Sequence, residues 1–238
     1  MKKFILLVGM VLCAMSQLAL ADDRGFYMQV GINQSDLPAP ISGEQLAIIA
    51  ENSINNLGVF SSSFTSSSSE DEDANGWAIT GGFQLNSIIG FEVAYADLGE
   101  SRATGAVSGV ANTISGFFAG DVTGEVSYEV QTLSVATTVS APLGNRFRLF
   151  GKLGLQQFRT DIEISSLVQG TIGGIPGTGS ASSSESEDGT SLLAGAGFAV
   201  EFVEGWELIG EMVRYADIDV GAEELDVDTL SLSLRISF

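Results

Sequence analysis

Apolar and polar residues alternate strictly along the last ten residues of the chain. One face carries only apolar side chains, namely Leu230, Leu232, Leu234, Ile236 and Phe238. The other face carries a threonine, three serines and Arg235. A period of two is typical of a β-strand, because successive side chains point to opposite faces. Residues 229–238 are therefore predicted to form a strand with one fully apolar face.

The same alternation recurs along the chain and predicts eight strands in all. The other seven segments are residues 26–33, 77–85, 89–96, 133–139, 147–156, 194–202 and 206–212. After residue 21, no stretch reaches the roughly 20 consecutive apolar residues that a membrane helix needs. The chain nevertheless combines 45% hydrophobic residues with a net charge of −20. This combination indicates strands that expose apolar faces rather than a buried soluble core.

The connections between these strands alternate between short and long. Short turns are expected at residues 86–88, 142–145 and 203–205, and long loops at residues 35–75, 100–124, 166–189 and 218–226. An even number of strands with short turns on one side and long loops on the other is typical of outer-membrane barrels. We therefore predict an all-β fold: an eight-stranded antiparallel up-and-down transmembrane β-barrel over residues 22–238, with its long loops outside the cell.

Two of the expected loops have a low-complexity acidic composition. Residues 66–75 read SSSSEDEDAN and residues 182–189 read SSSESEDG. We expect both to be solvated, mobile loops. A divalent-cation site that bridges to phosphorylated lipid headgroups is the alternative, although the ordered ligand spacing of a calcium loop is absent. In the first long loop, Glu44 to Ile54 are expected to form a short amphipathic helix.

The N-terminus has the pattern of a secretory signal peptide. Two lysines precede an apolar stretch, and small residues at Ala19 and Ala21 stand before Asp22. We expect residues 1–21 to be removed by cleavage after Ala21. The one cysteine, Cys13, would leave with the signal, and Leu12 before it disfavours a lipid anchor. Neither a disulfide nor a thiol chemistry is expected afterwards.

Charge and composition exclude several classes of function. Loss of Lys2 and Lys3 with the signal shifts the formal net charge from −20 to −22, which repels nucleic acid. The chain has no histidine, so neither a Ser-His-Asp triad nor a usual zinc site can form. Acidic residues are too numerous for any catalytic pair to stand out. We expect no catalytic residues, metal site or cofactor, and hence no enzyme.

Charged residues on the polar faces of the predicted strands point into the barrel. These are Glu92, Arg148, Lys152, Glu201, Glu207, Glu211 and Arg235. Since side chains fill the interior of an eight-stranded barrel, charges from different strands meet there, and unpaired ones would be costly. We predict a lumenal network of ion pairs that acts as a static plug rather than a switchable gate. Ile209 and Val213 would also face inward.

The order of several segments resembles the OmpA-like small outer-membrane β-barrel family. The segments are Gly25–Gly31 (GFYMQVG), Phe91–Gly99 (FEVAYADLG), its partial repeat Arg214–Ile218 (RYADI), and the terminal strand that ends on Phe238. Glu92 precedes Tyr95 by three residues, whereas Glu211 precedes Tyr215 by four. This difference predicts a bulge or a change of phase in the seventh strand.

The resemblance implies an integral outer-membrane location, surrounding lipid, transit with periplasmic chaperones and insertion by the barrel-assembly machinery. It implies that Leu230, Leu232, Leu234, Ile236 and Phe238 form the assembly signal. It also matches Glu92, Lys152, Glu211 and Arg235 to the family's lumenal ion-pair cluster. We expect a monomeric, non-enzymatic protein that serves membrane integrity or surface interaction. A narrow pore, or OmpW-like transport of small molecules, is the alternative.

Overall fold

The computed structural model describes residues 25–238 except for 39–40, 56–58, 72, 115 and 221–222. The predicted signal peptide and its cleavage site lie outside the described residues. The described part contains nine strands and one helix. The strands are β1 (Gly25–Asp36), β2 (Val59–Asp71), β3 (Asp73–Gln84), β4 (Ile89–Thr113), β5 (Gly116–Pro142), β6 (Phe147–Ile172), β7 (Ile175–Val203), β8 (Trp206–Val220) and β9 (Glu223–Ser237), and the helix is α2 (Gly43–Asn55).

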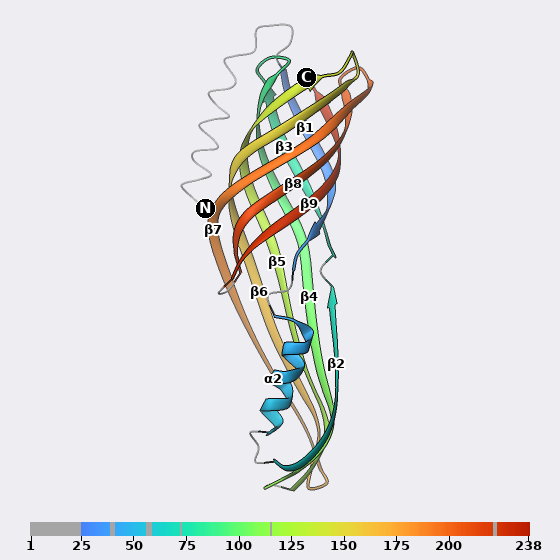
Figure 1. The fold of residues 1–238 in the computed structure, drawn as a ribbon, viewed down its shortest axis with the longest axis vertical. Coiled ribbons are helices and arrows are strands. Elements are labelled where there is room, and N and C mark those ends of the chain that lie inside the picture. The colour runs from blue at the N-terminus through green and yellow to red at the C-terminus, as the bar shows by residue number, and fades with distance from the viewer. Residues whose placement is uncertain (1–24, 39–40, 56–58, 72, 115, 221–222) are drawn as a thin grey trace.

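Eight of the strands close into an antiparallel ring (Figure 1). The order runs β4-β3-β1-β9-β8-β7-β6-β5, and pairing of β5 with β4 completes the circle. The last predicted strand closes the ring, because β9 pairs with β1 from Ser237 opposite Tyr27 to Asp228 opposite Asp36. The prediction of an eight-stranded antiparallel barrel is confirmed. In the described residues, no helix is long and apolar enough to cross a membrane.

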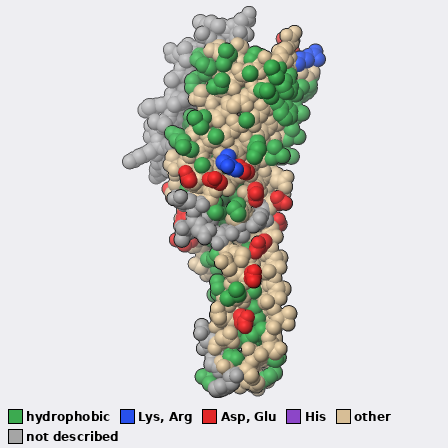
Figure 2. Space-filling view, viewed as in Figure 1, with side chains coloured by type: hydrophobic (Ala, Val, Ile, Leu, Met, Phe, Trp, Pro, Cys, Tyr) green, Lys and Arg blue, Asp and Glu red, His purple; other side chains and the backbone are tan. Residues whose placement is uncertain are grey.

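The short turns gather at one end of the ring. There the backbone N–H of Ser237 donates to the carbonyl of Gly205 over 2.9 Å, and that of Glu201 to Arg146 over 2.8 Å. The wall around this end is apolar on its outer face. Its exposed apolar side chains include Met28, Val30, Ile32, Ile79, Val139, Leu149, Leu153, Leu155, Leu192, Leu208, Met212, Leu230 and Leu232. The green belt over the upper part of Figure 2 shows this lipid-compatible surface.

Aromatic side chains flank the apolar belt. Trp77 and Tyr95 pack with ring centres 5.5 Å apart at the far rim, and Phe147 and Phe198 stack at 6.2 Å nearer the short turns. Aromatic girdles at the two membrane interfaces are typical of outer-membrane barrels. The belt between them is the part of the molecule that fits the hydrocarbon core.

The structure corrects the expectation of long, mobile loops. Strands β4 to β7 are 25, 27, 26 and 29 residues long and run on as paired hairpins through most of residues 100–124 and 166–189. The two acidic low-complexity segments also lie mostly in strands: residues 66–71 in β2, 73–75 in β3 and 182–189 in β7. Cross-strand pairing satisfies their backbone groups, so serine and glycine are tolerated without an apolar face.

Beyond the ring these strands continue as an open extension of the same sheet, which we call the distal sheet. It runs in the order β2-β4-β5-β6-β7 and consists of residues 59–71, 101–113, 116–129, 161–172 and 175–188. Strand β2, which the sequence did not predict, pairs with β4 from Ser61 to Asp71. In Figure 1 the distal sheet continues below the ring, with β2 along one edge.

Helix α2 covers the concave face of the distal sheet and confirms the helix expected over Glu44 to Ile54. The side chains of Leu46, Ala47, Ala50 and Ile54 are buried against residues of β4 and β5. A reciprocal pair starts the helix: the Ser42 N–H donates to Gln45 Oε1 over 3.0 Å, and the Gln45 N–H donates to Ser42 Oγ over 3.2 Å. Such a capping box satisfies two N–H groups that the first turn leaves open.

Two strands shift register where they leave the ring. In β4 the shift lies between Asp97 and Glu100, where Gly99 has a φ of 94°. In β8 it lies between Tyr215 and Ile218, where Asp217 has a φ of 51°. Pairing of β8 with β9 is regular from Trp206 to Tyr215. The bulge therefore lies after Tyr215 and does not explain why Tyr215 follows Glu211 by four residues. That spacing instead turns Tyr215 inward, whereas Tyr95 faces out toward Trp77.

Candidate functional site

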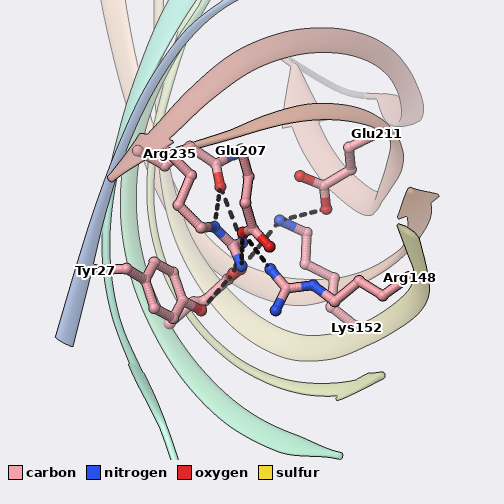
Figure 3. A network of polar contacts seen from close by, with 8 residues as sticks. Tyr27, Arg148, Lys152, Glu207, Glu211 and Arg235 are labelled. Atoms are coloured by element: carbon pink, nitrogen blue, oxygen red, sulfur yellow. Dashed lines mark hydrogen bonds and ion pairs between the residues drawn. The ribbon is translucent and has the colours of Figure 1, made fainter. Parts of the chain in front are cut away.

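The lumen of the ring holds charged side chains from four strands at the level of the apolar belt (Figure 3). Glu92 comes from β4, Arg148 and Lys152 from β6, Glu207 and Glu211 from β8, and Arg235 from β9. We call these six residues the lumenal network. Each points inward because side chains alternate along its strand, and the apolar side chains of that strand point outward. Ile209 and Val213 of β8 are buried on the same inner side.

Glu92 is the centre of the lumenal network. One of its oxygens, Oε1, accepts a hydrogen bond from the Tyr27 hydroxyl over 2.8 Å and from Arg235 Nη2 over 3.0 Å. The other, Oε2, lies 3.5 Å from Lys152 Nζ. The Glu92 side chain is only 4% exposed. A carboxylate this deeply buried requires such partners, because an unpaired buried charge costs several kcal/mol.

Lys152 bridges two carboxylates on opposite sides of the lumen. Its Nζ lies 2.5 Å from Glu211 Oε1 on β8, in addition to its contact with Glu92 on β4. Strands β5 and β7 separate β6 from these two partners in the ring. The side chain therefore ties three strands that share no backbone pairing with one another.

The two arginines complete the lumenal network toward the short turns. Arg235 donates from Nε and Nη2 to Gln29 Oε1 over 3.2 and 3.0 Å, and its guanidinium lies 4.0 Å from the centre of the Tyr27 ring. Arg148 Nη2 lies 2.6 Å from Glu207 Oε2, and Arg235 Nη1 lies 3.7 Å from the same oxygen. A cation above an aromatic face gains further stabilisation when it is desolvated.

The lumenal network is neutral as a whole, since three carboxylates meet three cations. Its contacts give each charge at least one partner of opposite sign. This balance explains how an eight-stranded barrel accommodates six buried or half-buried charges in an interior that side chains fill. The arrangement binds the strands to one another across the lumen.

Glu201 stands apart from the other predicted lumenal residues. Its Oε1 accepts a hydrogen bond from the backbone N–H of Gly205 over 3.1 Å, at the turn between β7 and β8. It therefore supports a turn at the end of the barrel.

Conversely, Tyr27 and Gln29 contact the lumenal network although they were not predicted to. Both lie on the polar face of the first predicted strand, which was the available signal.

An apolar plug fills the lumen between the lumenal network and the distal sheet. Its buried side chains include Leu37, Leu98, Tyr128, Val130, Phe158, Leu193, Tyr215, Ile218 and Val227. Leu37 follows β1 and is fully buried, and the Tyr128 hydroxyl donates to the carbonyl of Pro38. Leu37 and Pro38, directly after β1, thus take part in closing the lumen at this level.

The surface of the distal sheet is acidic. From residue 36 to 145 the sequence holds one basic residue, Arg102, and from 160 to 213 it holds none. Arg102 pairs with Glu100 and Glu125 at the base of the sheet, and Arg159 pairs with Asp161 over 2.9 Å. On the face drawn in Figure 2, the distal part shows acidic side chains and no Lys or Arg.

The base of the β6–β7 hairpin carries a carboxyl group with a shifted pKa. Hydrogen bonds from Arg159, and then from Ser186, hold the pKa of Asp161 below its ordinary value. The acidic side chains do not converge on a common point: among the described residues, no three His, Cys, Asp or Glu side chains are grouped to hold a metal ion. The distal sheet therefore presents a spread negative surface.

Comparison with known proteins places the chain in a family. The family model described as "Outer membrane protein beta-barrel domain" matches residues 4–238. None of the curated proteins matches the sequence.

Solved structures with a similar fold have low sequence identity. The chain is similar to the attachment invasion locus protein Ail of Yersinia pestis, with 14% identity, 92% of this chain and 100% of Ail covered, and a TM-score of 0.44. Neisserial surface protein A shares 12% identity; the match covers 91% of this chain and 100% of that protein, with a TM-score of 0.47. The outer membrane protein OprG of Pseudomonas aeruginosa shares 12% identity; the match covers 93% of this chain and 98% of OprG, with a TM-score of 0.48. The family model, together with the closed ring and its apolar belt, shows that the chain belongs to the outer membrane β-barrel domain family and is an integral protein of the bacterial outer membrane.

Proposed function

We propose that this protein is a non-enzymatic surface-interaction protein, in which a closed barrel anchors the distal sheet outside the cell. The observation that carries the proposal is the length of β4 to β7, which are 25 to 29 residues long. A membrane-spanning strand needs about 9–11 residues, so about 15 residues of each strand, or roughly 50 Å along the strand, extend beyond the belt.

The organisation of the distal sheet supports this proposal. Simple connections between barrel strands would need neither a fifth strand nor a helix. Here β2 extends the sheet, and α2 buries Ala47, Ala50 and Ile54 against Val107 and Val122. The result is a packed unit that holds its surface in one shape. A preformed surface binds a partner without first losing the conformational entropy of a mobile loop.

The filled lumen favours the anchor over a pore. Ions would have to displace the lumenal network, whose Glu92 and Arg235 are almost fully buried, and then pass the apolar plug that holds Tyr128 and Phe158. We expect no stepwise conductance from the protein in planar lipid bilayers. Reproducible single-channel steps that persist in an Arg235→Lys variant would support the pore alternative instead.

The proposal includes the partners that the barrel needs to reach its place. The apolar belt would contact outer-membrane lipid, and the final strand would be read by the barrel-assembly machinery after transit with periplasmic chaperones. The protein would act as a monomer. Its ring has no unpaired wall strand among the described residues, because β4 and β5 complete the circle.

Removal of the distal sheet tests the proposal. One variant joins Asp36 to Asp73, Ala103 to Val126, and Ile164 to Ser183, through Asn-Gly turns, so that α2 and β2 are removed together with the two hairpins. The residues of each pair are opposite one another. Bacteria that display the full chain should adhere to cultured epithelial cells or to immobilised matrix proteins more than bacteria that display the trimmed barrel. Equal adhesion, with equal amounts of heat-modifiable protein in the outer membrane, would contradict the proposal.

A further inference from the structure

One edge of the distal sheet has no neighbouring strand. Strand β7 pairs with β6 from Ile175 to Val200, but with β8 only from Leu193 onward. On its other side, residues 175–188 have no strand partner within the described part of the chain. Residues 175–186 are all exposed, and Ile175 is 74% exposed. The segment is an open strand edge about 14 residues long.

The hairpin turn determines which backbone groups point away from β6. Gly173 and Gly174 have φ values of 61° and 83°, as in the two-residue turn that joins hydrogen-bonded flanking residues. The backbone N–H and C=O groups of Ile175 therefore bond to those of Ile172, and the backbone groups of the odd-numbered residues of β7 point toward β6. The even-numbered residues, from Pro176 to Ser186, direct their backbone groups to the open edge. Pro176 has no N–H, so its place in an edge strand loses no bond to β6.

Small residues beside this edge leave a groove on the concave face of the sheet. Gly177 and Gly179 have no heavy atom within 4 Å of the position where a Cβ would stand. Phe118, Val168 and Ile172 form the apolar floor, and the groove has a volume of about 510 Å³. A strand added at the edge would place alternate side chains over these glycines, as neighbours on the same face of a sheet do.

Nearer the membrane, the same face of β7 is acidic. Glu185 is exposed there, and Glu187 follows it at the next position on this face. The sequence has no basic residue between 160 and 213, and Glu185 takes part in none of the ion pairs among the described residues. Charge complementarity therefore favours a cationic occupant and disfavours a second copy of this acidic chain.

From these observations we propose that the open edge of β7 binds an extended, basic peptide segment of a partner protein as an added antiparallel strand. The inference deepens the proposed function and rests on it. The bound segment would carry Arg or Lys opposite Glu185 and Glu187 and aromatic or aliphatic side chains opposite Gly179 and Gly177. Main-chain hydrogen bonds to Thr178, Ser180, Ser182 and Ser184 supply affinity, and the two kinds of side-chain position supply specificity.

Synthetic peptides test the added strand without any change to the protein. The probe is an eleven-residue threonine-rich peptide with two arginines and two phenylalanines at the stated positions, measured by fluorescence anisotropy with the full chain in lipid vesicles. It should bind with a measurable Kd. A peptide with arginines and phenylalanines exchanged should bind at least about 10-fold more weakly, because its charges would lie over the apolar groove.

Backbone methylation distinguishes strand addition from other contacts. Methyl groups on the two peptide nitrogens opposite Ser180 and Ser182 should weaken binding at least about 10-fold, since they block N–H groups of the ladder. Methyl groups on the nitrogens opposite Gly179 and Ala181 should leave the Kd within about 2-fold, because those N–H groups point away. Equal effects of the two modifications, or no binding of the unmodified probe, would overturn the inference.

Variants of the protein then locate the site. Glu185→Gln should weaken binding by about 2- to 5-fold at low salt, in the range of one exposed ion pair. Glu163→Gln is the matched control, because Glu163 lies one strand inward on the opposite face. Gly179→Leu should fill the groove and weaken binding of the probe, and the open space at Gly179 accommodates the new side chain.

The same variants in the adhesion assay separate this inference from the proposed function. If the trimmed barrel loses adhesion but Gly179→Leu and Glu185→Gln keep it, the distal sheet acts through another surface and the β7 inference is wrong. If the trimmed barrel keeps adhesion, the proposed function itself fails. Loss of adhesion in the trimmed barrel and in Gly179→Leu supports both.

Discussion

The ammonium group of Lys152 on β6 lies 2.5 Å from a carboxylate oxygen of Glu211 on β8, although β7 separates the two strands. The same ammonium group is 3.5 Å from Glu92 on β4, across β5. One side chain thus spans half of the ring. The contact turns a sheet that is held by neighbour-to-neighbour hydrogen bonds into a tube braced across its interior.

Removal of this brace should cost more than removal of a surface ion pair. Lys152→Met would leave Glu92 with Arg235 and Tyr27, but it would leave Glu211 without an ion-pair partner. We expect the free energy of unfolding to fall by about 3–5 kcal/mol, as for other broken buried pairs. Urea unfolding in lipid vesicles, followed by tryptophan fluorescence, measures the change.

Arg159→Met is the control for that prediction. It removes the exposed pair with Asp161, whose side chain is 41% exposed, and should cost less than about 1 kcal/mol. Lys152→Met combined with Glu211→Gln should recover part of the lost stability, because the unpaired carboxylate is gone. A Lys152→Met variant no less stable than Arg159→Met would show that the network does not brace the barrel.

Arg148 and Glu207 should behave as a coupled pair. Arg148 Nη2 lies 2.6 Å from Glu207 Oε2, and the two side chains are 20% and 16% exposed, so the pair is only partly shielded from solvent. In a double-mutant cycle with Arg148→Met and Glu207→Gln, we expect a coupling energy of about 1–3 kcal/mol. Since Arg235 also approaches Glu207, the single change at Glu207 should cost more than the change at Arg148. Strictly additive effects would contradict the contact.

The sequence predicted the ring well because each wall strand divides two environments. Lipid on one side and a packed lumen on the other impose the period of two that places Glu92 and Lys152 inward and Leu153 and Leu232 outward. Ile209 and Val213 also obeyed this phase although they are apolar. Tyr27 and Gln29 were missed as partners of the lumenal network, although they share a polar strand face.

The distal sheet was not predictable by the same signal. In β7 from Ile175 to Ser186 both faces meet solvent, so nothing selects an alternating pattern, and pairing with β6 alone holds the strand. The expected mobile loops were wrong for this reason. Ala103, Val107 and Ala111 are buried in clusters with α2, but Ala106 and Val110 on the other face are also apolar, so this segment showed no alternation either. The bulge at Asp217 depends on contacts that the sequence does not display.

The final strand should matter more for assembly than for stability. Phe238 is 76% exposed, so its side chain contributes little burial to the fold. Phe238→Ser should lower the amount of protein in the outer membrane and leave the melting temperature of refolded protein in detergent within about 2 °C. Leu193→Ala, at a buried site, is the reverse control: it should lower the melting temperature. A large loss of stability in Phe238→Ser would argue against a recognition role.

Helix α2 should stabilise the distal sheet without supporting the ring. Leu46 packs against Ala103 and Val126, and a buried Leu→Ala change typically costs about 2–5 kcal/mol. Leu46→Ala should therefore increase amide hydrogen exchange in residues 101–113 and 116–129 and leave exchange in β1 and β9 unchanged. Ile48→Ala, on the exposed side of the helix, is the matched control. Increased exchange throughout the ring would show that the two parts unfold together.

Acid should loosen the base of the β6–β7 hairpin before it affects the barrel. Hydrogen bonds from Arg159 and Ser186 lower the pKa of Asp161 in the folded protein. A lowered folded-state pKa means that this contribution is complete above the ordinary aspartate pKa of about 3.9 and is lost as the pH falls through the folded value. Protection of the amides near Asp161, calculated as the intrinsic exchange rate at each pH divided by the observed rate, should decline below about pH 4. Asp161→Asn should remove this pH dependence while β1 and β9 stay protected, and an unchanged decline in that variant would assign it to another carboxylate.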